Sequence, residues 1–269
     1  MIRAVGLVAG AVFRESVRDR VPYSMVIFAV LLMAASYLIS QMTAGQDLKI
    51  IKDLGLAAIA TFGLLIAVFI GIGLVSKEVE RKSVYGLLTK PLTRPQFILG
   101  KYAGLVLTLA VNIAAMTVAF YAVLYYIDAT ASVSTRAGWP APAMDPRLLV
   151  AIGLIFAELM VVTAVAVFFS TFSSPLLATL LTLALWVAGH FNADLRNFEN
   201  VVDVTAVTWI AKTLYYVLPN LAPFNVKAEV VHGFPVAMRH VALTLLYAAI
   251  YAGMLLVAAV AIFRRRDFK

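Results

Sequence analysis

Long apolar stretches alternate with short polar ones along this chain, and the spacing predicts a polytopic helical membrane protein. A helix that crosses the hydrocarbon core needs about 20 mostly apolar residues. Six stretches have the length and composition expected of spans. We expect these spans at Val21–Ser40, Leu54–Val75, Tyr102–Ile127, Leu148–Phe169, Pro175–Phe191 and Val241–Phe263. The expected fold class is all-α, with one transmembrane domain over residues 1–269.

Helix-start signals agree with two of these boundaries. Asp145 followed by Pro146 is typical of an N-cap with proline in the first turn, and Ser174 followed by Pro175 repeats the pattern. The intervening sequence STFSSP therefore predicts a very tight turn between the fourth and fifth spans.

Composition supports the membrane assignment and excludes several chemistries. The chain is 63% hydrophobic and only 13% charged, whereas about 25% of a soluble domain is charged. It has no cysteine, which excludes disulfides, thiolate metal sites and cysteine nucleophiles. His190, His232 and His240 show no metal-binding spacing, and LGKYAG (Leu99–Gly104) lacks the remainder of a P-loop. We therefore expect no enzyme activity, metal or cofactor in this chain.

The net charge of +8 is distributed unevenly along the chain. With six spans, both termini share one side with the loop at residues 77–101. That side carries 14 Lys and Arg against five Asp and Glu, while the other side carries eight of each, Glu158 excluded. The positive-inside rule then predicts cytoplasmic termini in a bacterial inner membrane, and the basic surplus indicates topology rather than nucleic-acid binding.

Residues 1–20 have the pattern of an amphipathic helix. Apolar side chains recur at helical spacing on one side, and arginines fall on the opposite side. The pattern predicts a helix in the membrane plane whose arginines meet anionic lipid headgroups. The apolar positions are Ile2, Val5, Val8, Val12 and Phe13; the arginines are Arg3, Arg14 and Arg18.

The outer segment at residues 192–240 contains a further apolar stretch, Val204–Phe224. It includes Lys212 and is broken by Pro219 and Pro223. A seventh span would also place the arginines at 264–266 outside, against the charge rule. We therefore expect an interfacial or re-entrant helix between spans five and six.

Glu158 is the one acid in the middle of an apolar span. Placing an ionised group there costs about 2.5–3.5 kcal/mol or more. Asn112 and Thr163 are candidate hydrogen-bond partners. Glu158, with Asn112, either lines a translocation path or subunit seam, or it is a neutral acid that bonds neighbouring helices. The Gly71 and Gly73 pair indicates close helix packing.

The loop between spans two and three has dense local signals for a helix, a break and a second helix. Ser83 can cap a short helix that ends before Pro91, and Thr93 with Gln96 forms a capping box leading into span three. The first helix has an apolar side with charged flanks, which is typical of a docking element. Its apolar side is Val84, Leu87 and Leu88, and the flanks are Glu78, Glu80, Arg81 and Lys82.

The stretch KEVERKSVYGLLTKPLTRPQFILGKYAG resembles the cytoplasmic loop of ABC type-2 permeases, with the NosY-like permeases as the nearest subgroup. VFRESVRDR before span one is similar to the connecting helix of that family, and FRRRDF is similar to its usual ending. The resemblance implies the membrane subunit of an ATP-binding cassette exporter, paired with a second copy or homologue. Separate ATPase subunits would bind ATP and Mg. They would contact the coupling helix, residues 83–90, and the N-terminal helix through Arg14 and Arg18.

Other classes stay open from the residues alone. A stand-alone secondary transporter or channel would need intramembrane charge pairs or unwound half-helices, and Glu158 is the sole acid available. A membrane anchor that recruits a soluble partner is a further alternative. The substrate is not indicated, because the expected wall residues are generic.

Overall fold

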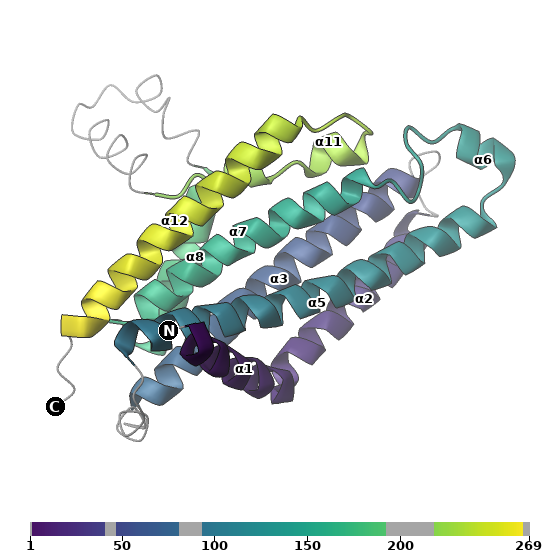
Figure 1. Cartoon of the computed structure of the whole chain (residues 1–269). Coiled ribbons are helices and arrows are strands. Elements are labelled where there is room, and N and C mark those ends of the chain that lie inside the picture. The colour runs from purple at the N-terminus through teal and green to yellow at the C-terminus, as the bar shows by residue number, and fades with distance from the viewer. Residues whose placement is uncertain (1, 41–46, 81–92, 192–217, 266–269) are drawn as a thin grey trace, which may run out of the picture.

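The structure is a computed structural model that describes residues 2–40, 47–80, 93–191 and 218–265. Every regular element in these ranges is helical (Figure 1), as expected for the all-α class. The elements are α1 (Ile2–Arg18), α2 (Arg20–Ser40), α3 (Asp47–Glu80), α5 (Arg94–Thr130), α6 (Val133–Ala137), α7 (Arg147–Ser170), α8 (Pro175–His190), η2 (Ala222–Phe224), α11 (Lys227–Val231) and α12 (Met238–Arg265).

Four of the described helices are long and apolar enough to cross a membrane, at Leu48–Ile72, Arg94–Thr130, Arg147–Ser170 and Met238–Arg264. They contain all of the predicted spans three, four and six and most of span two. A fifth crossing exists if α1 and α2, which are bent by 61° relative to each other, form one span. α8 has 16 residues, fewer than the roughly 20 that a crossing needs. Four to five candidate spans are therefore shown, and the six-span count stays a prediction.

α7 lies at the centre of the bundle, where it packs against α3, α5, α8 and α12. Small residues allow the close approach of α3: a Cβ built at Gly71 would lie 3.2 Å from Ala166 Cβ. This contact confirms the close packing predicted at Gly71. The packing around Gly73 lies outside what the structure describes. Because α7 is covered on all these sides, a polar group on it must find its partners within the protein.

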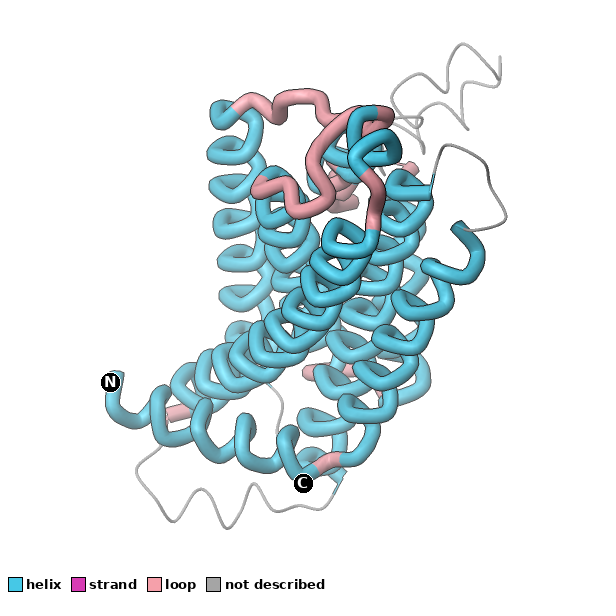
Figure 2. The backbone as a smooth tube through the Cα atoms, turned by 90° about the vertical axis from the view of Figure 1, so that its right-hand side faces the viewer, coloured by secondary structure: helices cyan, strands magenta, loops and turns pink. Residues whose placement is uncertain are grey.

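One end of the bundle, called here the basic end, is formed by α1, the first turns of α5 and the last turn of α12 (Figures 1 and 2). The opposite end, called the far end, holds α6 and α11. α5 runs without interruption from one end to the other. Its 37 residues span about 55 Å at 1.5 Å per residue, more than the hydrocarbon core of about 30 Å requires. Its final turns and α6 therefore project beyond the bundle.

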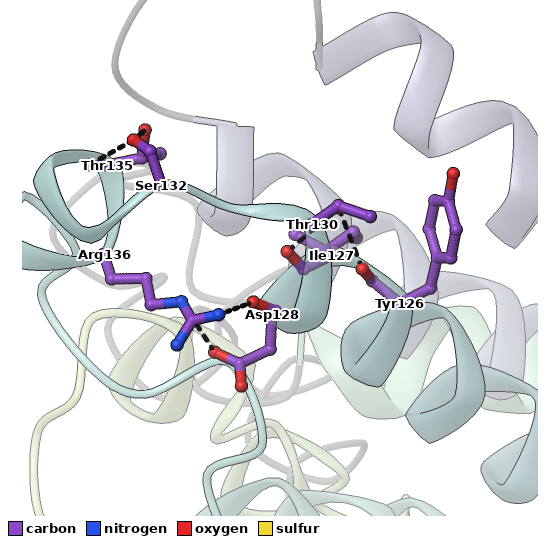
Figure 3. Close-up of polar contacts among 7 residues, drawn as sticks. All are labelled: Tyr126, Ile127, Asp128, Thr130, Ser132, Thr135 and Arg136. Atoms are coloured by element: carbon purple, nitrogen blue, oxygen red, sulfur yellow. Dashed lines mark hydrogen bonds and ion pairs between the residues drawn. The ribbon is translucent and has the colours of Figure 1, made fainter.

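Polar contacts close the turn between α5 and α6 (Figure 3). Arg136 donates to the Asp128 carbonyl oxygen, and its Nε lies 3.8 Å from Asp128 Oδ1. The Ser132 hydroxyl accepts from the Thr135 amide over 3.2 Å, which is an N-cap for α6. The projecting turn is thus fixed by its own hydrogen bonds.

Buried polar side chains hold the loop after α6 against the bundle. Lys52 is only 1% exposed, and its Nζ donates to the Pro142 carbonyl oxygen over 2.8 Å. The Tyr121 hydroxyl donates to the Asp145 carbonyl oxygen over 3.1 Å. Asp145 Oδ1 accepts from the Arg147 amide over 2.9 Å, but Pro146 and not Asp145 is the N-cap of α7, one residue later than predicted. The far end is therefore connected to both α3 and α5.

Candidate coupling and translocation sites

α1 lies directly across the first turns of α5 and approaches its backbone closely. A Cβ at Gly100 would lie 2.6 Å from Val8 Cβ, and one at Gly104 would lie 2.7 Å from the Ala9 carbonyl oxygen and Val12 Cβ. The two glycines are four residues apart and share one helix face, as in small-xxx-small contacts between helices. Side chains at these positions would push α1 away, so α1 and the start of α5 form one packed unit.

α1 separates the two sides of the pattern expected for residues 1–20, and its position in the membrane plane stays a prediction. Val12 is buried and Val8 packs against the core, while the arginines on the opposite side are exposed. Arg14 and Arg18, both predicted to contact an ATPase, therefore face outward from the basic end. An exposed cationic surface suits contact with lipid headgroups or with a charged protein partner.

The first turn of α5 also holds the last turn of α12. Arg94 Nη1 donates to the carbonyl oxygens of Phe263 and Arg264 over 3.1 and 2.6 Å. These bonds satisfy carbonyls that have no partner within their own helix. Phe97 stacks on Phe263 with ring centroids 6.1 Å apart. α5 is therefore joined to α12 by both polar and aromatic contacts.

The predicted start of the second loop helix is confirmed. α5 begins immediately after Thr93, whose amide donates to Gln96 Oε1 over 3.0 Å as part of a capping box. Glu78 and Glu80 lie in the last turn of α3, and their side chains fall outside the description. The other predicted coupling residues lie outside the described residues, so the first loop helix stays a prediction: Arg81, Lys82, Ser83, Val84, Leu87 and Leu88.

Glu158 is buried within α7, and its contacts come from α8. Trp186 Nε1 donates to Glu158 Oε1 over 2.7 Å, and His190 Nε2 lies 3.5 Å from the same oxygen. The prediction of Asn112 and Thr163 as partners is wrong. Each bonds a carbonyl of its own helix instead: Asn112 Nδ2 donates to Thr108 and Thr163 Oγ1 to Leu159, both over 2.7 Å.

A count along the α7–α8 hairpin could have found Trp186. Because the turn between the helices is tight, residues at equal distances from it lie at equal depth. Glu158 precedes Ser170, the end of α7, by 12 residues, and Trp186 follows Pro175, the start of α8, by 11. His190 is one helical turn further on the same face. Sequence spacing alone gave no sign that this histidine has a carboxylate neighbour.

Residues 218–231 pack inside the far end beside this cluster. The Leu221 amide donates to the Gly189 carbonyl oxygen over 2.9 Å, and Leu221 and Phe224 are buried against Ala157. The Asn220 amide donates to the Tyr247 hydroxyl over 2.8 Å, which attaches the segment to α12. Non-helical backbone among membrane helices is tolerated when protein surrounds it in this way.

Part of the outer-segment prediction can be compared with this arrangement. Residues 218–224 are a loop followed by the single 3₁₀ turn η2, not the regular helix expected there, because Pro219 and Pro223 interrupt the helical hydrogen bonds. Residues 204–217 lie outside the described residues. His240 is half-buried, and its Nε2 lies 2.8 Å from the Pro223 carbonyl oxygen.

Lys227 begins α11 on the same side of the bundle. Burial lowers the pKa of its ammonium group, and the carboxylates of Glu158 and Asp53 act in the opposite direction. Glu158 is thus surrounded by an indole N–H, an imidazole and the field of a lysine. Within the described parts of the chain, no three His, Asp or Glu side chains are grouped to hold a metal ion. The cluster is suited to hydrogen bonding and charge pairing between helices.

Together, the apolar helices, the buried acid and the amphipathic α1 define a multi-pass helical membrane protein. A family model described as ABC-2 family transporter protein matches residues 7–268, and the chain belongs to this family. The chain is accordingly a transport protein of the ABC transporter permease type. No curated protein matches it.

Proposed function

We propose that this chain is the transmembrane subunit of an ATP-binding cassette exporter, paired with a second copy or a homologue. Separate ATPase subunits bind ATP and Mg in this proposal, and the chain itself holds no cofactor. Family membership over residues 7–268 supports a permease. The NosY-like subgroup rests on the loop sequence alone, and the stand-alone transporter and the membrane anchor are not favoured.

The observation that carries this proposal is the three-helix joint at the basic end. α5 starts at Arg94, four residues after the end of the predicted coupling helix at residues 83–90. α1 is packed onto Gly100 and Gly104, and Arg94 holds the last turn of α12. A force applied to the loop or to α1 would therefore move α1, α5 and α12 together. We expect a separate ATPase to bind at this joint and to move the three helices together.

α5 offers a route from this joint to the far end. A continuous helix moves as a rigid element, and α5 also bonds the loop before α7 through Tyr121. ATP-driven closure of two ATPase subunits would thus shift α5 and re-pack the helices around α7. In physical terms this is rigid-body switching between two packed arrangements.

Orientation and the path belong to the same proposal. The uneven charge distribution supports a cytoplasmic position for the basic end and both termini, with six spans in a bacterial inner membrane. Glu158, with its partners on α8, and the half-buried Asn112 on α5 are proposed to line the path or the seam between subunits. The transported substrate is left open.

Co-expression with an ATPase encoded by an adjacent reading frame tests the proposal. A tagged permease should retain the ATPase through detergent purification, and the complex should hydrolyse ATP. The double variant Glu80→Arg/Arg81→Glu keeps the net charge and should lower retention of the ATPase and ATP turnover at least ten-fold. Arg239→Glu, an exposed reversal at the start of α12, is the control.

Two results would contradict the proposal. Normal retention and turnover in the Glu80→Arg/Arg81→Glu variant would remove the coupling assignment. Absence of any retained ATPase, together with transport by the purified chain alone in vesicles, would establish the stand-alone alternative.

A further inference from the structure

A groove of about 660 Å³ lies on the bundle surface between the start of α5 and the second half of α12. Its volume is within the range of about 300–1,000 Å³ that is typical of ligand sites. Leu99 contributes from α5, and Val257, Val260 and Ala261 contribute from α12. The groove is independent of the Glu158 cluster and of the α1 contact.

The walls of the groove are apolar, and one end carries a cation. Arg264 lines the groove at the basic end and is exposed. Among the described residues, the Arg264 guanidinium has no hydrogen bond or ion pair. The carbonyl oxygens at the end of α12 already accept from Arg94, so the negative end of the helix dipole is partly satisfied. The positive charge of Arg264 is therefore available to an anion at the rim.

The length of the groove suits one leaflet of a bilayer. Gly253 and Arg264, both of which line it, are 11 residues apart on α12, or about 16 Å at 1.5 Å per residue. Half of a hydrocarbon core is about 15 Å. Gly253 leaves the inner end open, because a Cβ built there would meet nothing within 4 Å.

We propose that this groove is a binding site for an anionic phospholipid of the leaflet at the basic end. An acyl chain lies along Leu99, Val257 and Val260, and the phosphate group meets Arg264. A lipid fits the combination of apolar walls, leaflet-length groove and cationic rim. A second copy packed symmetrically through this face would bring the same Arg264 rims toward each other, which like-charge repulsion disfavours.

The test measures lipid binding to the purified full-length chain in detergent. Phosphatidylglycerol or phosphatidylcholine with identical acyl chains is added, and bound lipid is counted by native mass spectrometry with thermal unfolding in parallel. The wild type should bind phosphatidylglycerol at least five-fold more tightly than phosphatidylcholine. Arg264→Gln should reduce this preference about five-fold, the effect expected for one arginine near an anionic lipid.

Three further variants separate the effect of the charge from that of the groove. Arg239→Gln removes one positive charge from the other end of α12 and should leave the preference unchanged. Gly253→Phe fills the inner end and should weaken binding of both lipids. Gly253→Ala adds only a Cβ to open space, so it should fold and bind as the wild type does.

Several outcomes would overturn the proposal. Equal binding of the two lipids by the wild type would show no anionic site. Equal losses in Arg264→Gln and Arg239→Gln would indicate a diffuse charge effect. A change from dimer to monomer in Gly253→Phe, with lipid binding intact, would assign the groove to a second copy.

Discussion

The indole nitrogen of Trp186 lies 2.7 Å from Glu158 Oε1 and donates a hydrogen bond to it across the α7–α8 interface. This bond joins the one acid in the middle of the central helix to a helix that is otherwise covered on few sides, since only three residues of α8 are buried. Helix pairing at this position therefore depends on a polar contact as well as on apolar packing.

Removing the Trp186 donor should weaken the α7–α8 pair. An intramolecular hydrogen bond contributes about 0.5–1.5 kcal/mol to stability, so Trp186→Phe should lower the midpoint of thermal unfolding in detergent. Glu158→Gln keeps an acceptor for the indole and should cost less than Glu158→Ala. Equal unfolding midpoints for the glutamine and alanine variants would show that the bond does not hold the helices together.

The same residues test the functional assignment of Glu158. We expect Glu158→Ala to abolish transport, or the coupled conformational change, before it unfolds the chain. Because the chain has no cysteine, one cysteine placed at the exposed Asn225 can report opening of the far end through maleimide labelling. ATP-dependent labelling in the Glu158→Ala complex equal to that of the unsubstituted complex would remove Glu158 from the path.

Gly104 should be intolerant of larger side chains. Its Cβ would lie 2.7 Å from the Ala9 carbonyl oxygen, which is backbone and cannot rotate away. Gly104→Leu should therefore separate α1 from α5, cost about 1–3 kcal/mol through overpacking and lower ATP turnover in the ATPase complex. Measurements are thermal unfolding and ATP hydrolysis.

Gly6 supplies the control for this variant on α1 itself. A Cβ at Gly6 would meet nothing within 4 Å, and alanine has the higher helix propensity, by up to about 1 kcal/mol. Gly6→Ala should therefore keep or raise stability and leave turnover unchanged. Turnover at the wild-type level in Gly104→Leu would show that α1 transmits no force to α5.

Arg94 should stabilise the last turn of α12. Arg94→Ala removes both side-chain bonds to the carbonyl oxygens of Phe263 and Arg264. We expect faster amide hydrogen exchange over residues 260–265 and a lower unfolding midpoint. Arg239→Ala, in the first turn of the same helix, is the control and should change neither quantity. Unchanged exchange in Arg94→Ala would show that α12 ends independently of α5.

Lys227 predicts a pH dependence of stability. Burial lowers its pKa in the folded state, so between that lowered value and 10.5 the unfolded chain binds more protons than the folded chain. The free energy of unfolding should therefore rise with pH in this window. In Lys227→Met the rise should be smaller than in the wild type, as measured by thermal unfolding between pH 7 and 10, with Lys49→Met as the matched loss of a lysine. The same slope in Lys227→Met and the wild type would contradict the assignment.

The predicted start of α5 was confirmed, and that of α7 was one residue early, because caps depend on residues within one turn. Gln96 reaches back to the Thr93 amide, and Asp145 accepts from the Arg147 amide. The amphipathic side of α1 was equally local, since helical pitch alone places Val8 and Val12 on one face. Each of these features requires only residues that are near in the sequence.

The partners of Glu158 were predicted wrongly because they depend on which helices meet. Asn112 and Thr163 were chosen for their polarity, yet each finds a carbonyl four residues back on its own helix, which any helix supplies. Trp186 reaches Glu158 only because the tight turn pairs α8 with α7. The predicted count of six spans is not confirmed either, since α8 is short and α2 counts only together with α1.

The sequence by itself determined that this protein is a helical membrane protein and where most of its long helices run. Those properties follow from apolar length, helical period and capping, all of which act over a few residues. Only the tertiary structure decided that Gly100 and Gly104 receive α1, that Arg94 holds α12 and that Glu158 faces α8. The reason is physical: these contacts join groups far apart in the chain, and their geometry is set by packing of the whole bundle.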